Sequence, residues 1–206
     1  MSAREGTFIA FEGGDGAGKS TQVARLAAAL EQAGREVVLT RQPGGTALGS
    51  ALRDLVLHGE AITPRAEALI FAADKAQHVA EVILPSLARG AVVITDRYVD
   101  SSIAYQGAGR DLGSAEVAEL QDWAVAGLVP HLTVLVDIDP GEGRRRRGSV
   151  HDRMEAEADP FHAAVRGHFL ALAESAPDRY LVVDGTATPE SIAATVWERV
   201  AAQGVA

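Results

Sequence analysis

The sequence predicts an α/β fold in which a five-stranded parallel sheet is covered by helices on both faces. Five short runs rich in Val, Ile and Leu lack polar alternation, which is typical of strands buried on both sides. Amphipathic helical patterns alternate with these runs along the whole length, as in repeated strand–helix–strand units. No linker long enough to separate two units interrupts the 206 residues, so we expect one domain over residues 1–206.

The predicted strands are separated by helical patterns. The strands cover residues 8–12, 36–40, 92–96, 132–137 and 180–184. The first predicted helix places Val23, Leu26 and Leu30 on one face and has Gly34 as its C-cap. Pro85 should bend or break the second of the remaining helices. Those remaining helices cover about 48–57, 65–89, 114–126, 161–173 and 189–201.

Composition and charge limit the classes of function. Hydrophobic residues make up 47% of the chain and charged residues 23%, as in soluble globular proteins. The formal net charge of −9 argues against a nucleic-acid partner, because such binding neutralises many phosphates, but it leaves room for a local basic pocket. The lack of cysteine excludes a disulfide and a cysteine nucleophile. Without a secretory signal or an apolar run of roughly 18 residues, we expect a cytoplasmic protein that binds no membrane.

A glycine-rich segment at residues 13–20, GGDGAGKS, matches the full pattern GxxxxGK[ST]. It joins a predicted strand to a predicted helix, the context in which backbone N–H groups turn around a phosphate at a helix N-terminus. We expect Lys19 to reach the β- and γ-phosphates and the Ser20 hydroxyl to bind Mg²⁺. The segment predicts ATP or GTP binding in a three-layer fold of the P-loop NTPase type. The expected ATP-binding residues here are Gly13, Gly14, Asp15, Gly16, Ala17, Gly18, Lys19, Ser20 and Thr21.

A second polar group follows the strand over 92–96. Ligands of open α/β sheets gather beyond the carboxyl ends of the strands. Asp96 is therefore placed to help hold Mg²⁺, directly or through water, and Arg97 to bind the phosphate of an acceptor bidentately. A surface ion pair between the two residues is the alternative that the residues alone leave open.

Four separated segments resemble the bacterial thymidylate kinase family, in the right order from about residue 7 to the last helix. They are FEGGDGAGKST at 11–21, TRQPGGT at 40–46, DRYVDSSIAYQG at 96–107 and RRRRGSVHDRME at 144–155. The resemblance implies that the γ-phosphoryl group of ATP is transferred to dTMP with Mg²⁺, giving ADP and dTDP for dTTP biosynthesis. It also implies a homodimer that is formed through helices such as the one over 65–89.

The resemblance also implies roles for individual residues. Asp15 should lie by the sugar 3′-hydroxyl and the phosphates, and Phe71 should stack on thymine. Catalytic roles fall to Lys19, Asp15, Arg97 and Arg153. Arg41 and Arg97 should hold the 5′-phosphate of dTMP. Ser102 and Gln106 should hydrogen-bond the edge of the base, and Tyr105 should pack beside the deoxyribose. The full set of expected dTMP-binding residues is Asp15, Arg41, Phe71, Lys75, Arg97, Ser102, Tyr105 and Gln106.

Two departures from the family pattern affect these roles. Gly16 stands where some members have a basic P-loop residue, so we expect the catalytic cation to come from an arginine-rich lid at about 141–157, with Arg147 and Arg153 closing on ATP. A solvated helix face or a nucleic-acid patch are alternatives for the arginine run. Lys75 stands where the family usually has Arg, which should weaken thymine recognition because Lys offers only a point charge.

Other functions remain as alternatives. Another nucleoside monophosphate kinase differs in the acceptor pocket, and a shikimate-type kinase would not need an aromatic platform for a base. A P-loop switch or partitioning ATPase is a different class, and the chain has no N-K-x-D guanine motif. The six histidines form no i,i+4 pair, so we predict no transition-metal site. Trp123 and Trp197 lie on apolar helix faces and are expected in the core or at an interface.

Overall fold

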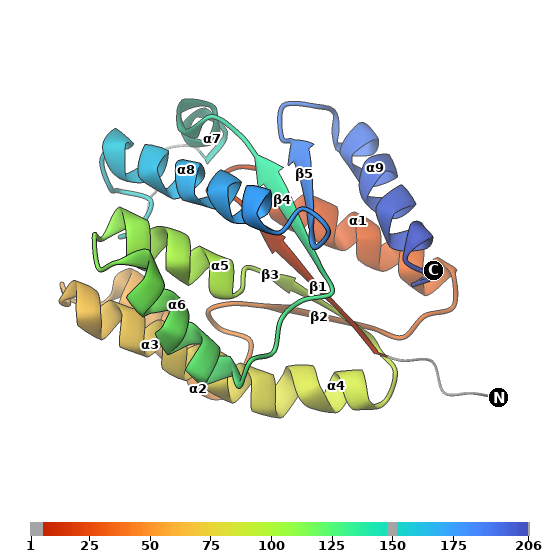
Figure 1. The fold of residues 1–206 in the computed structure, drawn as a ribbon, viewed down its shortest axis with the longest axis horizontal. Helices are drawn as coiled ribbons and strands as arrows, with labels where there is room; N and C mark the ends of the chain where they lie inside the picture. Colours follow the sequence, from red (N-terminus) through yellow and green to blue (C-terminus); the bar gives the residue numbers. More distant parts are fainter. Residues whose placement is uncertain (1–5, 148–151, 206) are drawn as a thin grey trace.

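Five parallel strands form the sheet that the sequence predicts. The computed structural model describes residues 6–147 and 152–205. The strand order is β2-β3-β1-β4-β5, with every neighbouring pair parallel (Figure 1). The strands are β1 (Thr7–Glu12), β2 (Val37–Arg41), β3 (Val92–Asp96), β4 (Leu132–Asp137) and β5 (Tyr180–Asp184).

Alternating side chains of β1 show why the sheet is covered on both faces. Ile9 and Phe11 pack against α1 and α9 on one face, whereas Phe8 and Ala10 pack against Val79 and neighbouring side chains on the other. Figure 1 shows the same three layers. The helices are α1 (Lys19–Gln32), α2 (Ala47–His58), α3 (Pro64–His78), α4 (Leu84–Ala88), α5 (Val99–Ser102), α6 (Ser114–Val125), α7 (Pro140–Arg147), α8 (Asp159–Ser175) and α9 (Pro189–Ala202).

The long helical pattern over 65–89 is divided, as Pro85 predicts. A π-helical segment, Val79–Ile83, separates α3 from α4 and ends two residues before the proline. The widened turn accommodates a ring that leaves no N–H for the regular ladder. α3 begins at a Thr63 cap, whose side chain accepts a hydrogen bond from the Ala66 N–H.

Two segments differ from the prediction. Residues 99–109 form α5 and a π-helical segment, Ile103–Gly109, although the Ser- and Gly-rich sequence predicted no helix there. Burial of Ile103 and Tyr105 against neighbouring elements overrides that weak propensity. The first half of the expected lid is helix α7, in which Glu142 pairs with Arg145 and with Arg146.

Residues 148–151 of the expected lid lie outside the described residues. Within the part of the chain that is described, no helix is both long and apolar enough to cross a bilayer.

Candidate active site

The P-loop between β1 and α1 is the first part of the site. Gly13 has a φ of 134° and lies against β4, where a Cβ would collide with the Val136 carbonyl, so only glycine fits. The Lys19 ammonium folds over the loop and donates to the carbonyls of Gly13 (3.0 Å) and Gly14 (2.8 Å). Burial lowers the pKa of Lys19 to about 8. A bound phosphate would favour the charged form, so the loop and its lysine are suited to an anion.

A polar cavity extends from the P-loop toward the ends of β2 and β3. More positively than negatively charged side chains line this cavity, which also suits a polyphosphate. Its lining comprises Asp15, Gly16, Gly18, Lys19, Ser20, Thr21, Arg41, Gln42, Arg53, Asp96, Arg97 and Arg146.

Ser20 and Asp96 meet at the edge of this cavity. The Ser20 hydroxyl donates to Asp96 Oδ2 at 2.8 Å. A hydroxyl and a carboxylate are the oxygen donors that Mg²⁺ prefers, and Mg²⁺ on a nucleotide needs few protein ligands besides phosphate oxygens and water. The donor set therefore fits Mg²⁺. Among residues 6–147 and 152–205 there is no cluster of three or more His, Asp or Glu side chains that could hold a metal on its own.

Asp15, Arg97 and Tyr105 form a polar cluster that joins the P-loop to the next cavity. Arg97 pairs with Asp15 through Nη2, and the Tyr105 hydroxyl donates to Asp15 Oδ2 at 2.7 Å. Arg97 Nη1 also donates to the Gly13 carbonyl at 3.1 Å. Burial alone would raise the pKa of the Asp15 carboxyl, but the charges of Arg97 and Lys19 outweigh it and hold that pKa well below its usual range. Asp15 is therefore ionised and keeps the Arg97 guanidinium beside the loop.

Glu12, which the sequence analysis missed, holds Arg97 in place. Arg97 has a φ of 71°, a left-handed conformation that costs roughly 1–2 kcal/mol for a residue with a Cβ. The buried Glu12 carboxylate accepts hydrogen bonds from the N–H groups of Tyr98 (2.8 Å) and Ser101 (3.2 Å). It also accepts from the Ser101 hydroxyl at 2.5 Å, and that hydroxyl accepts from Arg97 Nη1 at 2.9 Å. Burial, with the nearby charge of Asp100, raises the pKa of Glu12 to about 7.

The second cavity brings together most of the residues expected to bind the acceptor. Phe71 and Lys75 come from α3, Asp15 follows β1, and Arg97, Ser102, Tyr105 and Gln106 follow β3. The cavity is part apolar and part polar, as suits a base attached to a charged phosphate. Its lining includes Asp15, Phe71, Lys75, Arg97, Ser102, Tyr105 and Gln106, all expected from the sequence, and Arg53, Asp152, Met154 and Glu155, which were not.

Lys75 lines this cavity and is buried. Its Nζ donates to Ser102 Oγ at 2.7 Å and to the Phe71 carbonyl at 3.4 Å, and lies 5.6 Å from the Phe71 ring centroid. Burial lowers the pKa of Lys75 to about 8. Lys75, which stands where the family usually has Arg, thus lies among the residues expected to bind the base.

Arg41 and Arg53 lie where the two cavities meet. Arg41 ends β2 and lines the cavity beside the P-loop, whereas Arg53 of α2 lines both cavities. Arg53 Nη1 donates to the Pro43 carbonyl at 3.2 Å, which fixes it toward the opening. Burial, then the charge of Arg41, lowers the pKa of Arg53. An arginine in a helix pattern gives no sign in the sequence that it faces a ligand, so Arg53 was missed.

Helix α7 packs directly on the P-loop through a glycine contact. A Cβ on Gly143 would collide with the Asp15 carbonyl, and a Cβ on Gly16 would collide with the Gly143 carbonyl. Both obstructing atoms are backbone oxygens, which cannot rotate away. The absence of a side chain at Gly16 therefore lets the arginine-bearing helix approach the loop.

We expect Gly143→Ala to lower kcat by about 10- to 100-fold, because it displaces α7 and its arginines from the P-loop. Binding of dTMP should change less than kcat does, since of the residues lining the second cavity only Asp15 contacts Gly143. Steady-state kinetics and calorimetry check both. Gly167→Ala on α8, where a Cβ meets nothing within 4 Å, is the matched control. Equal kcat values for the two variants would contradict the contact's importance.

Two lid arginines, Arg146 and Arg147, line different cavities next to the P-loop. Arg147 lies in a small cavity with Gly14, Asp15 and Tyr105, and its Nη1 is 3.6 Å from Glu155 Oε1. Arg147 thus lies beside the P-loop but does not line the cavity that suits a polyphosphate, and its expected role at ATP stays a prediction. Arg146 donates to the Gly185 carbonyl at 2.9 Å and lines the cavity beside the P-loop.

Arg153 lies elsewhere than expected. We predicted that it closes on ATP, but its Nη2 donates to Glu67 Oε2 at 2.7 Å and its Nε to the Val56 carbonyl at 2.8 Å. Glu67 is only 1% exposed, and a buried carboxylate needs compensating charge. In this structure Arg153 thus anchors the lid to α2 and α3, and does not face the P-loop.

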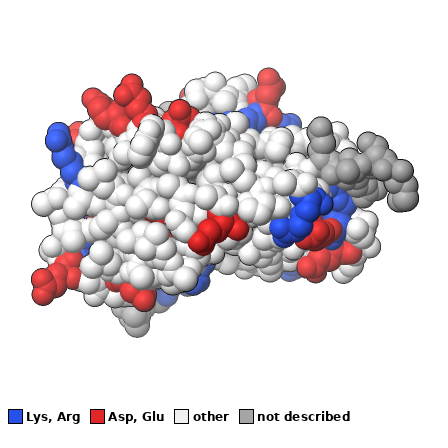
Figure 2. Space-filling model, turned by 90° about the horizontal axis from the view of Figure 1, so that it is seen from below, with Lys and Arg blue, Asp and Glu red and all other residues white. Residues whose placement is uncertain are grey.

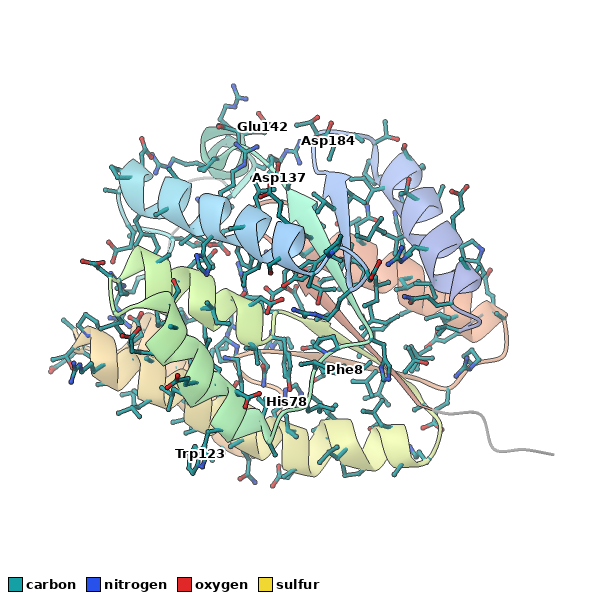
Figure 3. All side chains as sticks on the ribbon, in the orientation of Figure 1. Phe8, His78, Trp123, Asp137, Glu142 and Asp184 are labelled. Atoms are coloured by element: carbon teal, nitrogen blue, oxygen red, sulfur yellow. The ribbon has the colours of Figure 1, made fainter. Side chains whose placement is uncertain are left out.

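The two tryptophans differ in burial. Trp197 belongs to α9 and is partly buried against the core cluster that α1 and α9 share. Trp123 is 81% exposed and points outward from α6 (Figure 3), so it is not a core residue. An interface is the remaining expectation for Trp123.

Known proteins match this chain over nearly its whole length. The family model described as thymidylate kinase matches residues 11–196. A thymidylate kinase from Leifsonia xyli subsp. xyli (strain CTCB07) is 56% identical over 197 residues, covering 94% of this chain and 93% of that protein. One from Clavibacter sepedonicus is 54% identical over 198 residues, covering 94% of each. The crystal structure of thymidylate kinase from Ehrlichia chaffeensis has a TM-score of 0.80 at 32% identity and covers 96% of this chain and 99% of that one. The chain belongs to the thymidylate kinase family.

Proposed function

We propose that this chain transfers the γ-phosphoryl group of ATP to dTMP, forming ADP and dTDP. The observation that carries the proposal is the Asp15–Arg97–Tyr105 cluster, which joins a P-loop to a cavity walled by Phe71. A donor site and an acceptor site with an aromatic wall thus share one boundary. Family membership supports the same reaction.

The chemistry follows from positions and charges. An oxygen of the acceptor's 5′-phosphate attacks the γ-phosphorus of ATP, and the bond from that phosphorus to the β,γ-bridging oxygen breaks, leaving ADP. The phosphate oxygen is already a nucleophile, so no side chain has to remove a proton. Lys19 binds the β- and γ-phosphates, Arg41, Arg53 and Arg97 hold the acceptor phosphate, and Arg147 stabilises charge on the transferred group.

We infer that Ser20 and Asp96 hold Mg²⁺ together with phosphate oxygens and water, because their donor set fits that ion. When bound, Mg²⁺ neutralises charge on the β- and γ-phosphates. A cytoplasmic location, one domain and the lack of a nucleic-acid or membrane partner stay predictions.

The identity of the acceptor is tested by rank order. ADP formation is followed with ATP, Mg²⁺ and each nucleoside monophosphate in turn. We expect dTMP to give the highest kcat/KM. A higher value for a purine nucleotide or for CMP would assign the chain to another nucleoside monophosphate kinase.

We expect Lys75→Arg to keep or lower KM for dTMP, because a guanidinium offers two fixed donors where the Lys75 ammonium offers a point charge. Steady-state kinetics with varied dTMP gives the value. Lys75→Met is the companion variant and should raise that KM. A severalfold rise of KM in Lys75→Arg would contradict the placement of Lys75 at the base.

We further propose a homodimer formed through α2, α3 and α6. Their outer side chains include Leu55, Leu69 and Trp123, which are 48%, 57% and 81% exposed. Figure 2, which views the molecule from the side of these helices, shows a broad surface with few charged side chains. An apolar surface of this kind is typical of an interface.

We expect Trp123→Glu to shift the chain from dimer to monomer, because a charge would be buried in the interface. Size-exclusion chromatography with light scattering measures the mass. Val182→Glu on β5 is the control, since Val182 is 47% exposed and lies away from this face. A dimer that persists in Trp123→Glu, or a wild type that is already monomeric, would contradict the proposed interface.

A further inference from the structure

The buried carboxylate of Glu67 accepts hydrogen bonds from three residues of two separate segments. It lies in the first turn of α3 and is 1% exposed. Oε1 accepts from Gln106 Nε2 at 2.9 Å and from Arg110 Nε at 3.2 Å. Oε2 accepts from Arg153 Nη2 at 2.7 Å and from Arg110 Nη2 at 3.3 Å. Two guanidinium groups and one amide thus direct four N–H donors at the carboxylate, so both of its oxygens serve as acceptors.

This arrangement determines which way the Gln106 amide faces. The two ends of an amide have similar shapes but opposite roles, one being a donor and the other an acceptor. Both oxygens of Glu67 accept hydrogen bonds, so Glu67 binds the NH₂ end of Gln106. The end left for the acceptor cavity, which Gln106 lines, is the carbonyl oxygen.

The cavity therefore offers an acceptor from Gln106 and a donor from Lys75, whose ammonium is held at Ser102. A pyrimidine with a 4-keto group presents the complementary pattern, an N3–H donor beside the O4 acceptor. Cytosine presents the reverse, an N3 acceptor beside an amino donor. An unpaired or opposed polar group in a buried site is costly, so the pattern favours the keto base.

We propose that Glu67 is a positioning residue that selects a 4-keto pyrimidine over cytosine by fixing the orientation of the Gln106 amide. This inference rests on the proposed function. Glu67 does not touch the base. Its effect passes through the orientation of one side chain.

Glu67→Gln tests this directly. The amide oxygen at 67 should take the Oε2 position, where two guanidinium N–H groups donate and cannot turn away. Its NH₂ group then takes the Oε1 position and faces Gln106, which must turn over and present its own NH₂ to the cavity. We expect the ratio of Kd for dCMP to Kd for dTMP, measured by calorimetry, to fall roughly tenfold or more. The ratio of dUMP to dTMP should stay within twofold, because uracil and thymine share this edge.

Two further variants complete the experiment. Arg110→Leu removes two hydrogen bonds to Glu67 but leaves an acceptor-only carboxylate at Gln106, so the dCMP-to-dTMP ratio should be retained. The exchanged pair Glu67→Gln with Gln106→Glu again places an acceptor in the cavity and should restore the preference for dTMP, which a purely structural role of Glu67 would not produce. Should Glu67→Gln not fold, the exchanged pair alone decides.

Because the test measures binding and not turnover, a failure of this inference can be distinguished from a failure of the proposed reaction. A preference for dTMP that persists in Glu67→Gln, or that is absent in the exchanged pair, would overturn the role of Glu67 and leave the kinase proposal standing. A wild type that binds dTMP selectively but transfers no phosphoryl group would overturn the kinase proposal, and the binding ratios would still test Glu67. Equal binding of dTMP and dCMP to the wild type would contradict both.

Discussion

Replacing Lys19 with alanine should lower kcat on the order of 10³-fold. The Lys19 ammonium is held over the P-loop by the carbonyls of Gly13 and Gly14, where the β- and γ-phosphates are expected. Its charge is needed most as negative charge develops on the transferred group. Steady-state kinetics at saturating ATP and dTMP measures the loss.

The Lys19→Ala protein should remain folded. Lys19 is only 7% exposed, and burial disfavours its charge, so removing the ammonium relieves a desolvation cost. The Tm should therefore stay the same or rise. Lys19→Met, which keeps the apolar stem, is the control. A loss of kcat below tenfold, or a collapse of the Tm in both variants, would contradict the role in charge stabilisation.

Replacing Arg97 with alanine should lower kcat/KM for dTMP by about 10²–10³-fold, with KM for dTMP rising more than KM for ATP. The guanidinium touches Asp15, Ser101 and Tyr105 and lies at the boundary of both cavities. Its removal also leaves the part-buried Asp15 carboxylate without its ion-pair partner, and the uncompensated negative charge repels an incoming phosphate. Kinetics with each substrate varied in turn separates the two KM values.

A double-mutant cycle with Glu12 checks how Arg97 is held. Glu12→Gln alone should raise KM for dTMP, because the amide cannot accept from Tyr98, Ser101 and the Ser101 hydroxyl together. In the Arg97→Ala background the same change should alter that KM less than twofold. Asp100→Asn, at a buried acid close to Glu12, is the control for general disruption. Additive effects of Glu12→Gln and Arg97→Ala would show that Glu12 does not act through Arg97.

Much of the fold was predictable because apolar runs and helical periodicity in the sequence mark most strands and helices. The strands over 92–96, 132–137 and 180–184 have the bounds that their apolar runs predict. The helix over 99–109 was not predictable, since its Ser and Gly residues disfavour helix and only burial among neighbouring elements compensates. Local propensity was therefore sufficient except where tertiary packing decides.

The residues of the site were likewise predictable where they belong to local motifs and were missed where they depend on long-range contacts. The P-loop and the residues from Asp96 to Gln106 are contiguous motifs, so their approximate places followed from the sequence. Glu12 and Glu67 were missed because their roles depend on contacts with residues 89 and 39 positions away. Arg153 lies away from its expected place for the same reason, since its partner Glu67 lies 86 positions away. Long-range pairing of buried charges leaves no periodic signal in a single sequence.

The central claim is that the P-loop and the Phe71-walled cavity act together on ATP and dTMP. The most direct measurement is the rate of ADP release with Mg²⁺ and ATP, with and without dTMP, alongside the appearance of dTDP. We predict that dTMP stimulates ADP release by orders of magnitude and that one dTDP forms for each ADP. ADP release at the same rate without dTMP, or with no dTDP formed, would contradict the account and indicate a P-loop ATPase of another class.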